Sequence, residues 1–311
     1  MAYIQHRCMR KNNKKNFDIY SSFSWFTPGW KGIIMLTLWF LVGVLLGNVV
    51  NVIFVFALGQ EAATEYGMVV SYLMMFIPPM MYASYKSKTN SLFDEGYALD
   101  SNNFGSKGGL VLSLLAIIST LALGYVLELF CTFLPEMPDW LKDTFEQLTG
   151  GNFWLNFLCV SIFAPFFEEW LCRGEVLRGL LNFKKKDGST GIKPVWAIVA
   201  SAAFFAIIHA NPWQAVVAFG TGCMFGYVYY KTGSLKLTML MHFTNNTFAL
   251  ICGHIDALAE MDTWKDVIPG SLYWIIYAAC VLLLILTIKE FSKISTRSSA
   301  GNCDRIAIVE E

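Results

Sequence analysis

The chain is poor in charge. Lys, Arg, Asp and Glu together make up 15% of its 311 residues, whereas 55% are hydrophobic, and the mean hydropathy is +0.49. A typical soluble domain carries about a quarter charged residues. This composition excludes an ordinary soluble protein and indicates a polytopic membrane protein.

Several common motifs are absent. The eight cysteines lie in apolar stretches or near the termini without a CxxC pair, which argues against a disulfide framework and a cysteine zinc site. There is no GxSxG elbow, no HExxH helix and no phosphate-binding glycine loop, so a serine hydrolase, an ordinary zincin and an NTPase lose support. No internal repeat, low-complexity tract or signal peptide is evident.

Apolar stretches long enough to form membrane helices occur eight times. The fold expected is an all-α integral membrane protein with about eight transmembrane helices, a single membrane domain at 32–290, and tails at 1–31 and 291–311. The fifth and sixth stretches are the shortest, so a re-entrant or shortened pair is an alternative there. The eight stretches are residues 32–58, 68–85, 110–134, 153–183, 194–209, 213–230, 235–252 and 271–288.

Every second linker along the chain is rich in basic residues. Of the 23, twenty lie on the predicted inner side, only Lys142 and Lys265 lie in outer linkers, and Arg173 lies within the fourth stretch. This bias predicts a multi-pass protein of the cell membrane with both termini cytoplasmic. The basic cluster at 184–186 is interpreted as a topology determinant and a contact with lipid headgroups, so the lipid bilayer is the expected partner and nucleic acid is not.

The fourth stretch contains charges that a membrane helix rarely carries. Glu169 and Arg173 are spaced i,i+4 in the favourable order for an ion pair. Glu168 lies about 100° further round the helix and is free to face a cavity. Charged groups at that depth cost several kcal/mol, roughly, and usually mark a functional site. The alternative is an ion-pair network that only fixes helix packing.

Two of the four histidines lie in predicted spans. Phe205 precedes His209 by four residues, and Asn246 follows His242 by four, so each shares a helix face with its histidine. We expect Phe205 to orient the His209 imidazole. A single membrane histidine is often just an interhelical hydrogen-bonding group, worth about 1 kcal/mol. Glu168, His209, His242 and Asn246 come from three spans that are otherwise poor in charge, and this favours a shared site.

Other polar groups in the spans have simpler explanations. Glu128, near the outer end of the third span, has no obvious partner and is interpreted as an interfacial residue. Glu175 is expected to pair with Arg178 at i+3.

These residue types suit hydrolysis of a peptide bond. A carboxylate and an imidazole in a water-accessible cavity can activate water, with the carboxylate taking the proton and the imidazole positioning the oxygen. A second imidazole and an amide are suitable donors to the oxyanion that develops on the scissile carbonyl.

The three motifs resemble those of the CPBP intramembrane proteases, the group that contains CAAX prenyl endopeptidases and Abi-type, bacteriocin-processing homologues. The motifs are Glu168-Glu169-x-x-x-Arg173, Phe205-x-x-x-His209 and His242-x-x-x-Asn246. The resemblance covers about 152–252, in the fourth to seventh helices. It implies a catalytic core there, in which Glu168 and His209 activate the water. By the same resemblance His242 and Asn246 stabilise the oxyanion or help to bind the substrate, and Glu169 and Arg173 are supporting residues. It also implies a peptide or membrane-protein substrate. The segment Trp170-Leu171-Cys172 departs from the family's usual aliphatic residues and Phe.

Two other functions stay open. A transporter or channel would use Glu168, His209 and His242 as a proton or ion relay, although such proteins more often show inverted repeats. A non-catalytic immunity or scaffolding protein would keep the polar cluster for specificity.

The same three residues are the right donor types for a zinc site with one open position. Metal-bound imidazoles normally donate their other N–H to an acceptor, and the sequence offers few such acceptors beside either histidine. We therefore expect a mechanism that requires no metal, with Glu168 as general base. If zinc binds, Glu168, His209 and His242 are its predicted ligands.

Overall fold

The computed structural model describes residues 20–91, 97–142, 151–185, 188–189, 191–259 and 263–296. These residues form helices and connecting turns, with no strand among them, so the fold is all-α as predicted. The principal helices are α2 (Trp30–Leu58), α4 (Met68–Asn90), α5 (Gly108–Cys131), the continuous run of α7 (Phe153–Asn156) to α9 (Arg178–Leu181), α10 (Pro194–Ile208), α11 (Pro212–Thr232), α12 (Leu235–Cys252) and α14 (Gly270–Ser292).

A helix occupies each of the eight predicted segments, but eight membrane crossings are not confirmed. Among the described residues, five helical runs are long and apolar enough to cross a membrane, namely Trp30–Leu58, Ala63–Asn90, Gly105–Cys131, Phe153–Leu181 and Gly270–Ser292. The apolar helix α10 has only 15 residues. Length and composition therefore support a multi-pass membrane protein without fixing how many of α10 to α12 cross fully.

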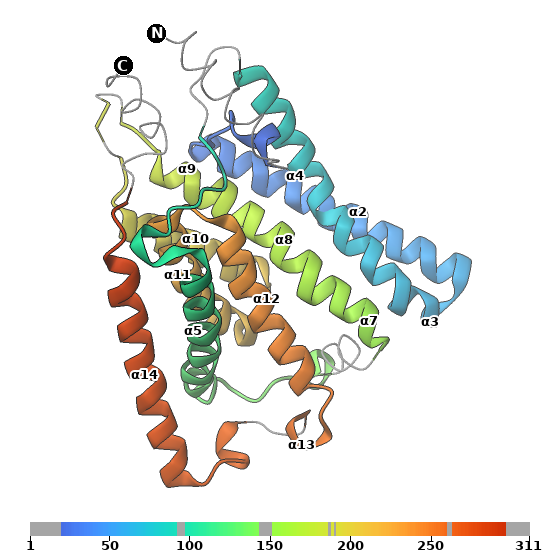
Figure 1. The fold of residues 1–311 in the computed structure, drawn as a ribbon. Helices are drawn as coiled ribbons and strands as arrows, with labels where there is room; N and C mark the ends of the chain where they lie inside the picture. The colour runs from blue at the N-terminus through green and yellow to red at the C-terminus, as the bar shows by residue number, and fades with distance from the viewer. Residues whose placement is uncertain are drawn as a thin grey trace.

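The run from α7 to α9 lies in the middle of the bundle (Figure 1). The hairpin of α2 and α4 packs on one side of this run, and α10 and α12 contact it from the other. α5 packs against α11, α12 and α14. The central run thus meets helices from both halves of the chain.

Two glycines bring α2 and α4 into close contact. Gly43 and Gly47 form a GxxxG pair on α2. A Cβ atom at Gly47 would lie 2.7 Å from the carbonyl oxygen of Ser71, and one at Gly43 would collide with the backbone of Met75. The Ser71 hydroxyl also donates to the Gly47 carbonyl, 2.9 Å away. Small residues allow such close approach of membrane helices, and here they fix the position of α4.

The segment before α2 is built into the bundle. Tyr20, Phe23 and Phe26 are buried. Arg178, at the start of α9, donates to the carbonyl of Phe26 and to that of Tyr97 at 2.7 Å. The part of the predicted tail that the structure describes therefore anchors the end of the central run.

The ion pair predicted within that run is present. Arg178 Nη2 lies 3.4 Å from Glu175 Oε2, and both side chains are buried.

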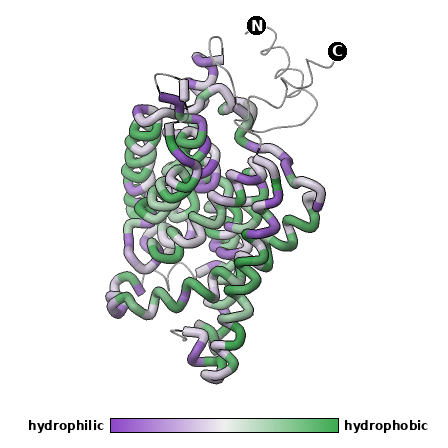
Figure 2. The backbone as a smooth tube through the Cα atoms, turned by 90° about the vertical axis from the view of Figure 1, so that its left-hand side faces the viewer, coloured by the Kyte–Doolittle hydropathy of each residue, from purple (hydrophilic) through white to green (hydrophobic). Residues whose placement is uncertain are grey.

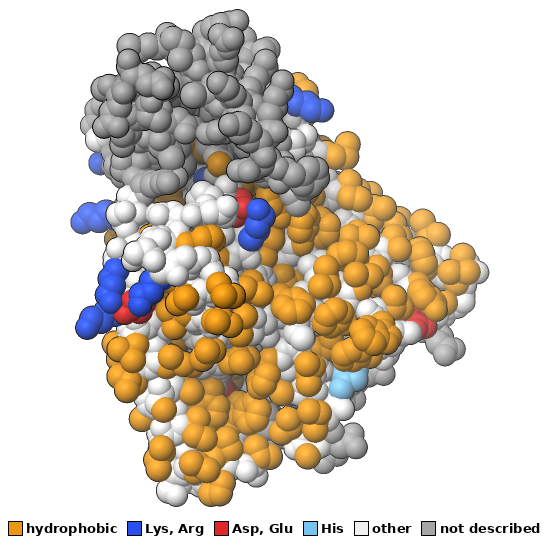
Figure 3. Space-filling view, viewed as in Figure 1, with side chains coloured by type: hydrophobic (Ala, Val, Ile, Leu, Met, Phe, Trp, Pro, Cys, Tyr) orange, Lys and Arg blue, Asp and Glu red, His pale blue; other side chains and the backbone are white. Residues whose placement is uncertain are grey.

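The outer surface is largely apolar. Figure 2 shows hydrophobic residues along the middle of the helices. In the view of Figure 3 the Lys and Arg side chains gather toward one end of the molecule. Exposed side chains on α2 and α14 include Leu45, Phe56 and Ile285. An apolar belt with a basic end is the surface expected of a protein embedded in a bilayer.

Candidate active site

The two adjacent glutamates lie on α8 (Ala164–Glu169), between two π-helical segments, Phe157–Phe163 and Trp170–Leu177. Pro165 has no N–H to donate, so the regular α-helical bonding is interrupted near it. Wider π turns are frequent at functional sites. In this run they present successive side chains of one helix to different neighbours.

Glu169 lies at the centre of a buried polar cluster. Its side chain is fully buried, and Oε1 accepts from Arg173 Nη1 at 2.7 Å and from His242 Nδ1 at 3.0 Å. Arg173 also donates to the Gly222 carbonyl at 3.3 Å. The pair predicted from the i,i+4 spacing is therefore present, and it extends to α12 through the histidine.

Aromatic rings enclose the arginine of this cluster. The guanidinium carbon of Arg173 lies 4.5 Å from the centroid of Phe205 and 5.4 Å from that of Phe225. Cation–π contacts of this kind are worth about 2 kcal/mol when desolvated. They help to keep a buried charge in one position.

His242 lies between the two glutamates. Its Nδ1 carries the proton, since its partner Glu169 Oε1 already accepts from Arg173 as a carboxylate. Its Nε2 faces Glu168 Oε2 at 3.8 Å. The imidazole thus has one nitrogen held and the other directed at the second carboxylate.

Glu168 is held by a residue that the sequence did not single out. Its side chain is 14% exposed, and Oε1 accepts from the hydroxyl of Tyr72 on α4 at 2.7 Å. A tyrosine in the middle of an apolar span is the one signal that was available, because a buried phenol usually finds a hydrogen-bond partner. The sequence alone did not indicate that the hydrogen-bond partner of Tyr72 is Glu168.

His209 caps the C-terminus of α10. Its Nδ1 lies 2.7 Å from the carbonyl oxygen of Phe205, and its ring meets that of Phe205 edge-on at 4.8 Å, as expected for an orienting neighbour. The next residue, Ala210, has φ of 56°, and Asn211 donates to the His209 carbonyl at 3.0 Å. The tight turn and Asn211 therefore hold His209 between α10 and α11.

The ring of Phe205 packs against both His209 and His242. Phe205 packs edge-on against His209 and also against His242, at a centroid distance of 5.5 Å. Within the described residues, however, His209 forms no hydrogen bond or ion pair with Glu168. The structure brings Glu168 and His242 together, and His209 reaches them only through the shared Phe205 ring.

Asn246 points into the first π-helical segment. Its Nδ2 donates to the Val160 carbonyl at 2.8 Å, and its Oδ1 accepts from Asn245 at 3.1 Å. Its amide nitrogen carries two N–H groups, so donation of one to Val160 leaves the other to donate to a substrate.

The expectation that few acceptors lie beside the two histidines was wrong. His209 is held by the backbone carbonyl of Phe205, and His242 by the carboxylate of Glu169. Periodicity could not reveal these acceptors, because one is a backbone atom and the other belongs to another helix. Even so, no group of three His, Cys, Asp or Glu side chains is placed to hold a metal ion in the part of the chain that the structure describes. The three predicted ligands fit zinc by type but not by placement.

Glu128 also has a partner that the sequence did not reveal. Its Oε1 accepts from the backbone N–H of Trp264 at 3.0 Å. The contact joins α5 to the segment before α14, so Glu128 is more than an interfacial side chain.

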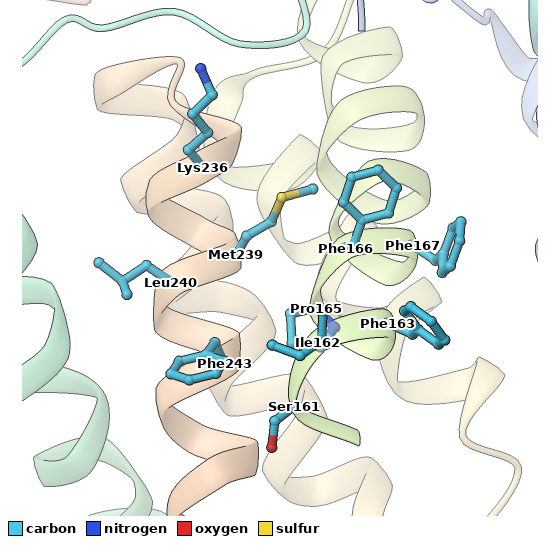
Figure 4. A pocket seen from close by; sticks show the side chains of 10 residues that line it. All are labelled: Ser161, Ile162, Phe163, Pro165, Phe166, Phe167, Lys236, Met239, Leu240 and Phe243. Carbon is cyan, nitrogen blue, oxygen red and sulfur yellow. The ribbon is translucent and has the colours of Figure 1, made fainter. Parts of the chain in front are cut away.

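An apolar groove of about 480 Å³ lies between the α7–α9 run and α12, and no residue of the polar cluster is among those that line it. Figure 4 shows Phe166 and Met239 pointing toward one another across it, with Lys236 at one end and Ser161 at the other. Lys236 pairs with Asp100 at 2.9 Å. Glu168 and His242 lie on the two elements that form the groove walls.

Fold and site together define the class of protein, a multi-pass all-α membrane protein with a buried Glu–Arg–His cluster between its helices. Residues 150–248 match the family described as type II CAAX prenyl endopeptidase Rce1-like. This match confirms the resemblance to CPBP proteases over about a third of the chain, and it contains Glu168, His209, His242 and Asn246. Comparisons with curated proteins and with solved structures found no match.

Proposed function

We propose that this protein is an intramembrane endopeptidase that hydrolyses a peptide bond at or within the bilayer. The observation that carries the proposal is the placement of Glu168 Oε2 against His242 Nε2, at 3.8 Å, inside the stretch that matches the family. The family match supports a CAAX-type protease. It gives no support to the transporter or to the non-catalytic alternative.

In the proposed reaction Glu168 is the general base. Its Oε2 takes a proton from water, the water oxygen attacks the scissile carbonyl carbon, and the same carboxyl returns the proton to the leaving amine when the C–N bond breaks. His209 positions the water. Its Nδ1 is held by the Phe205 carbonyl, which leaves Nε2 to interact with the nucleophile.

His242 and Asn246 are the proposed oxyanion donors. Because Nδ1 of His242 donates to Glu169, its Nε2 donates a hydrogen bond only in the imidazolium form. Glu169 and Arg173 then have a supporting role, since the carboxylate fixes both the orientation and the proton of this ring. Asn246 donates through the N–H that its bond to the Val160 carbonyl does not use.

The groove supports a substrate with an apolar tail. Phe166, Met239 and Phe243 line it, and it lies on the same two elements as the proposed base and donor. Burial of a lipid chain yields about 0.8 kcal/mol per CH₂ group, so such a groove would hold the prenyl chain of a peptide substrate. We therefore propose a prenylated C-terminal C-a-a-X peptide as the substrate class.

The proposal includes no metal. Its support is the placement of the donors, because Glu168, His209 and His242 do not form a group that could hold an ion in the described structure. Every proton transfer above is assigned to the chain's own side chains.

The test uses the full chain in liposomes with a fluorogenic peptide that ends in a farnesylated C-a-a-X sequence. The matched control peptide lacks the farnesyl group. We expect wild type to cleave the farnesylated peptide, and Glu168→Gln to be at least about 100-fold slower, because an amide cannot act as the base. A parallel incubation with the host's membrane proteome reads new termini. If neither peptide nor any membrane protein is cut in a Glu168-dependent way, the proposal is wrong.

A further inference from the structure

Tyr72 contacts the proposed base from outside the family stretch. Its hydroxyl donates to Glu168 Oε1 at 2.7 Å, and it lies on α4, well before the matched residues 150–248. Hydrogen bonds to charged acceptors are short and about twice as strong as neutral ones. This contact is therefore more than packing between two helices.

The hydrogen bond from Tyr72 determines which oxygen of the Glu168 carboxylate is directed at the reacting centre. Tyr72 occupies Oε1, and Oε2 is the atom that faces His242 Nε2 at 3.8 Å. A carboxylate can rotate about its last side-chain torsion, which is a soft one. A donor on one oxygen restricts that rotation and keeps the other oxygen directed at the reacting centre.

The position of Tyr72 is itself fixed by packing. Its ring lies 5.4 Å from that of Phe76, one turn along α4, and Phe76 stacks on Phe167 of α8 at 5.2 Å. About 100° round α4 from Tyr72, Ser71 meets Gly47 of α2, where a Cβ atom would not fit. The hairpin of α2 and α4 therefore holds the phenol against α8.

We propose that Tyr72 is a positioning residue of the active site, which holds Glu168 so that Oε2 accepts the proton from water. This inference rests on the proposed protease function for its catalytic meaning, but the contact itself is testable without any substrate. It makes α4 part of the active site.

The first test compares Tyr72→Phe and Tyr72→Leu in the farnesylated-peptide assay. Phe removes only the hydroxyl, whereas Leu also removes the ring. We expect both to lower kcat by about tenfold, because the base is no longer held in its productive orientation, and to leave KM within about twofold. Leu should lower the unfolding temperature more than Phe does, because it removes the ring packing as well as the hydrogen bond. The matched control is Tyr85→Phe, an exposed tyrosine on the same helix, which should behave as wild type.

The second test is infrared spectroscopy of the full chain in detergent. The difference between wild type and Glu168→Gln isolates the carboxyl bands of Glu168. Loss of the phenol donor in Tyr72→Phe should shift those bands, whereas Tyr85→Phe should leave them unchanged.

The outcomes separate the two proposals. Unchanged bands, or a Tyr72→Phe variant with wild-type kcat, would overturn the positioning role. Shifted bands in a protein that cuts no substrate would show that the contact exists but would overturn its catalytic meaning together with the proposed function. A loss of activity confined to Tyr72→Leu would mean that the ring matters only for packing.

Discussion

Replacing Glu169 with Gln tests the reasoning about the buried cluster most directly. The substitution removes one negative charge with little change of shape. Glu169 is fully buried, and its Oε1 accepts from Arg173 at 2.7 Å and from His242 at 3.0 Å. In the variant, Arg173 is a buried cation with only neutral partners, namely the Gly222 carbonyl at 3.3 Å and two aromatic rings.

The expected loss of stability follows from these contacts. Removing one partner of a buried ion pair typically costs about 3–5 kcal/mol. The amide oxygen of Gln can still accept one N–H bond, and cation–π contacts worth about 2 kcal/mol remain. We therefore expect the lower end, about 3 kcal/mol. At about 2 °C per kcal/mol, the unfolding temperature should fall by about 6 °C.

Glu168→Gln is the matched comparison. The Glu168 side chain is 14% exposed and has no Arg or Lys partner within the described residues, and the amide oxygen of Gln can still accept from Tyr72. Its unfolding free energy should change by less than about 1 kcal/mol, whereas its activity should be lost because the base is gone.

Thermal unfolding in detergent and the farnesylated-peptide assay, run on the same preparations, distinguish the two glutamates. If both variants unfold at the wild-type temperature and only Glu169→Gln is inactive, the roles are reversed and the reasoning is refuted.

Two further predictions concern topology and metal. A single cysteine that replaces Lys184 in a cysteine-free variant should be protected from an impermeant external reagent, whereas one that replaces Lys265 should be labelled. The reason is that linkers rich in basic residues favour the cytoplasmic side. External labelling at position 184 would contradict the predicted orientation. Protein purified without added metal and dialysed against a strong chelator should keep its activity if Glu168 acts without an ion. Elemental analysis should then find less than about 0.1 zinc per chain. Near-stoichiometric zinc, with activity lost on chelation and restored by zinc, would instead make Glu168, His209 and His242 metal ligands.

Local spacing explains what the sequence predicted well. The helical segments follow from apolar runs of sufficient length. The contacts of Glu169 with Arg173 and of Phe205 with His209 follow from the i,i+4 relation, because a helix places such residues on one face whatever surrounds it. The sequence therefore predicted the helices, the ion pair and the orienting ring. The number of membrane crossings did not follow, because short helices buried among neighbours need not span.

The contacts between helices were decided by the tertiary structure alone. Tyr72 reaches Glu168, Glu169 rather than Asn246 holds the His242 ring, and Asn246 bonds to the backbone of Val160. Each depends on where two helices cross and on how far a π turn rotates the side chains, and neither quantity is encoded in the period of an apolar pattern. For the same reason the sequence could nominate Glu168 and His242 as partners, but only the packed bundle determines which oxygen faces which nitrogen.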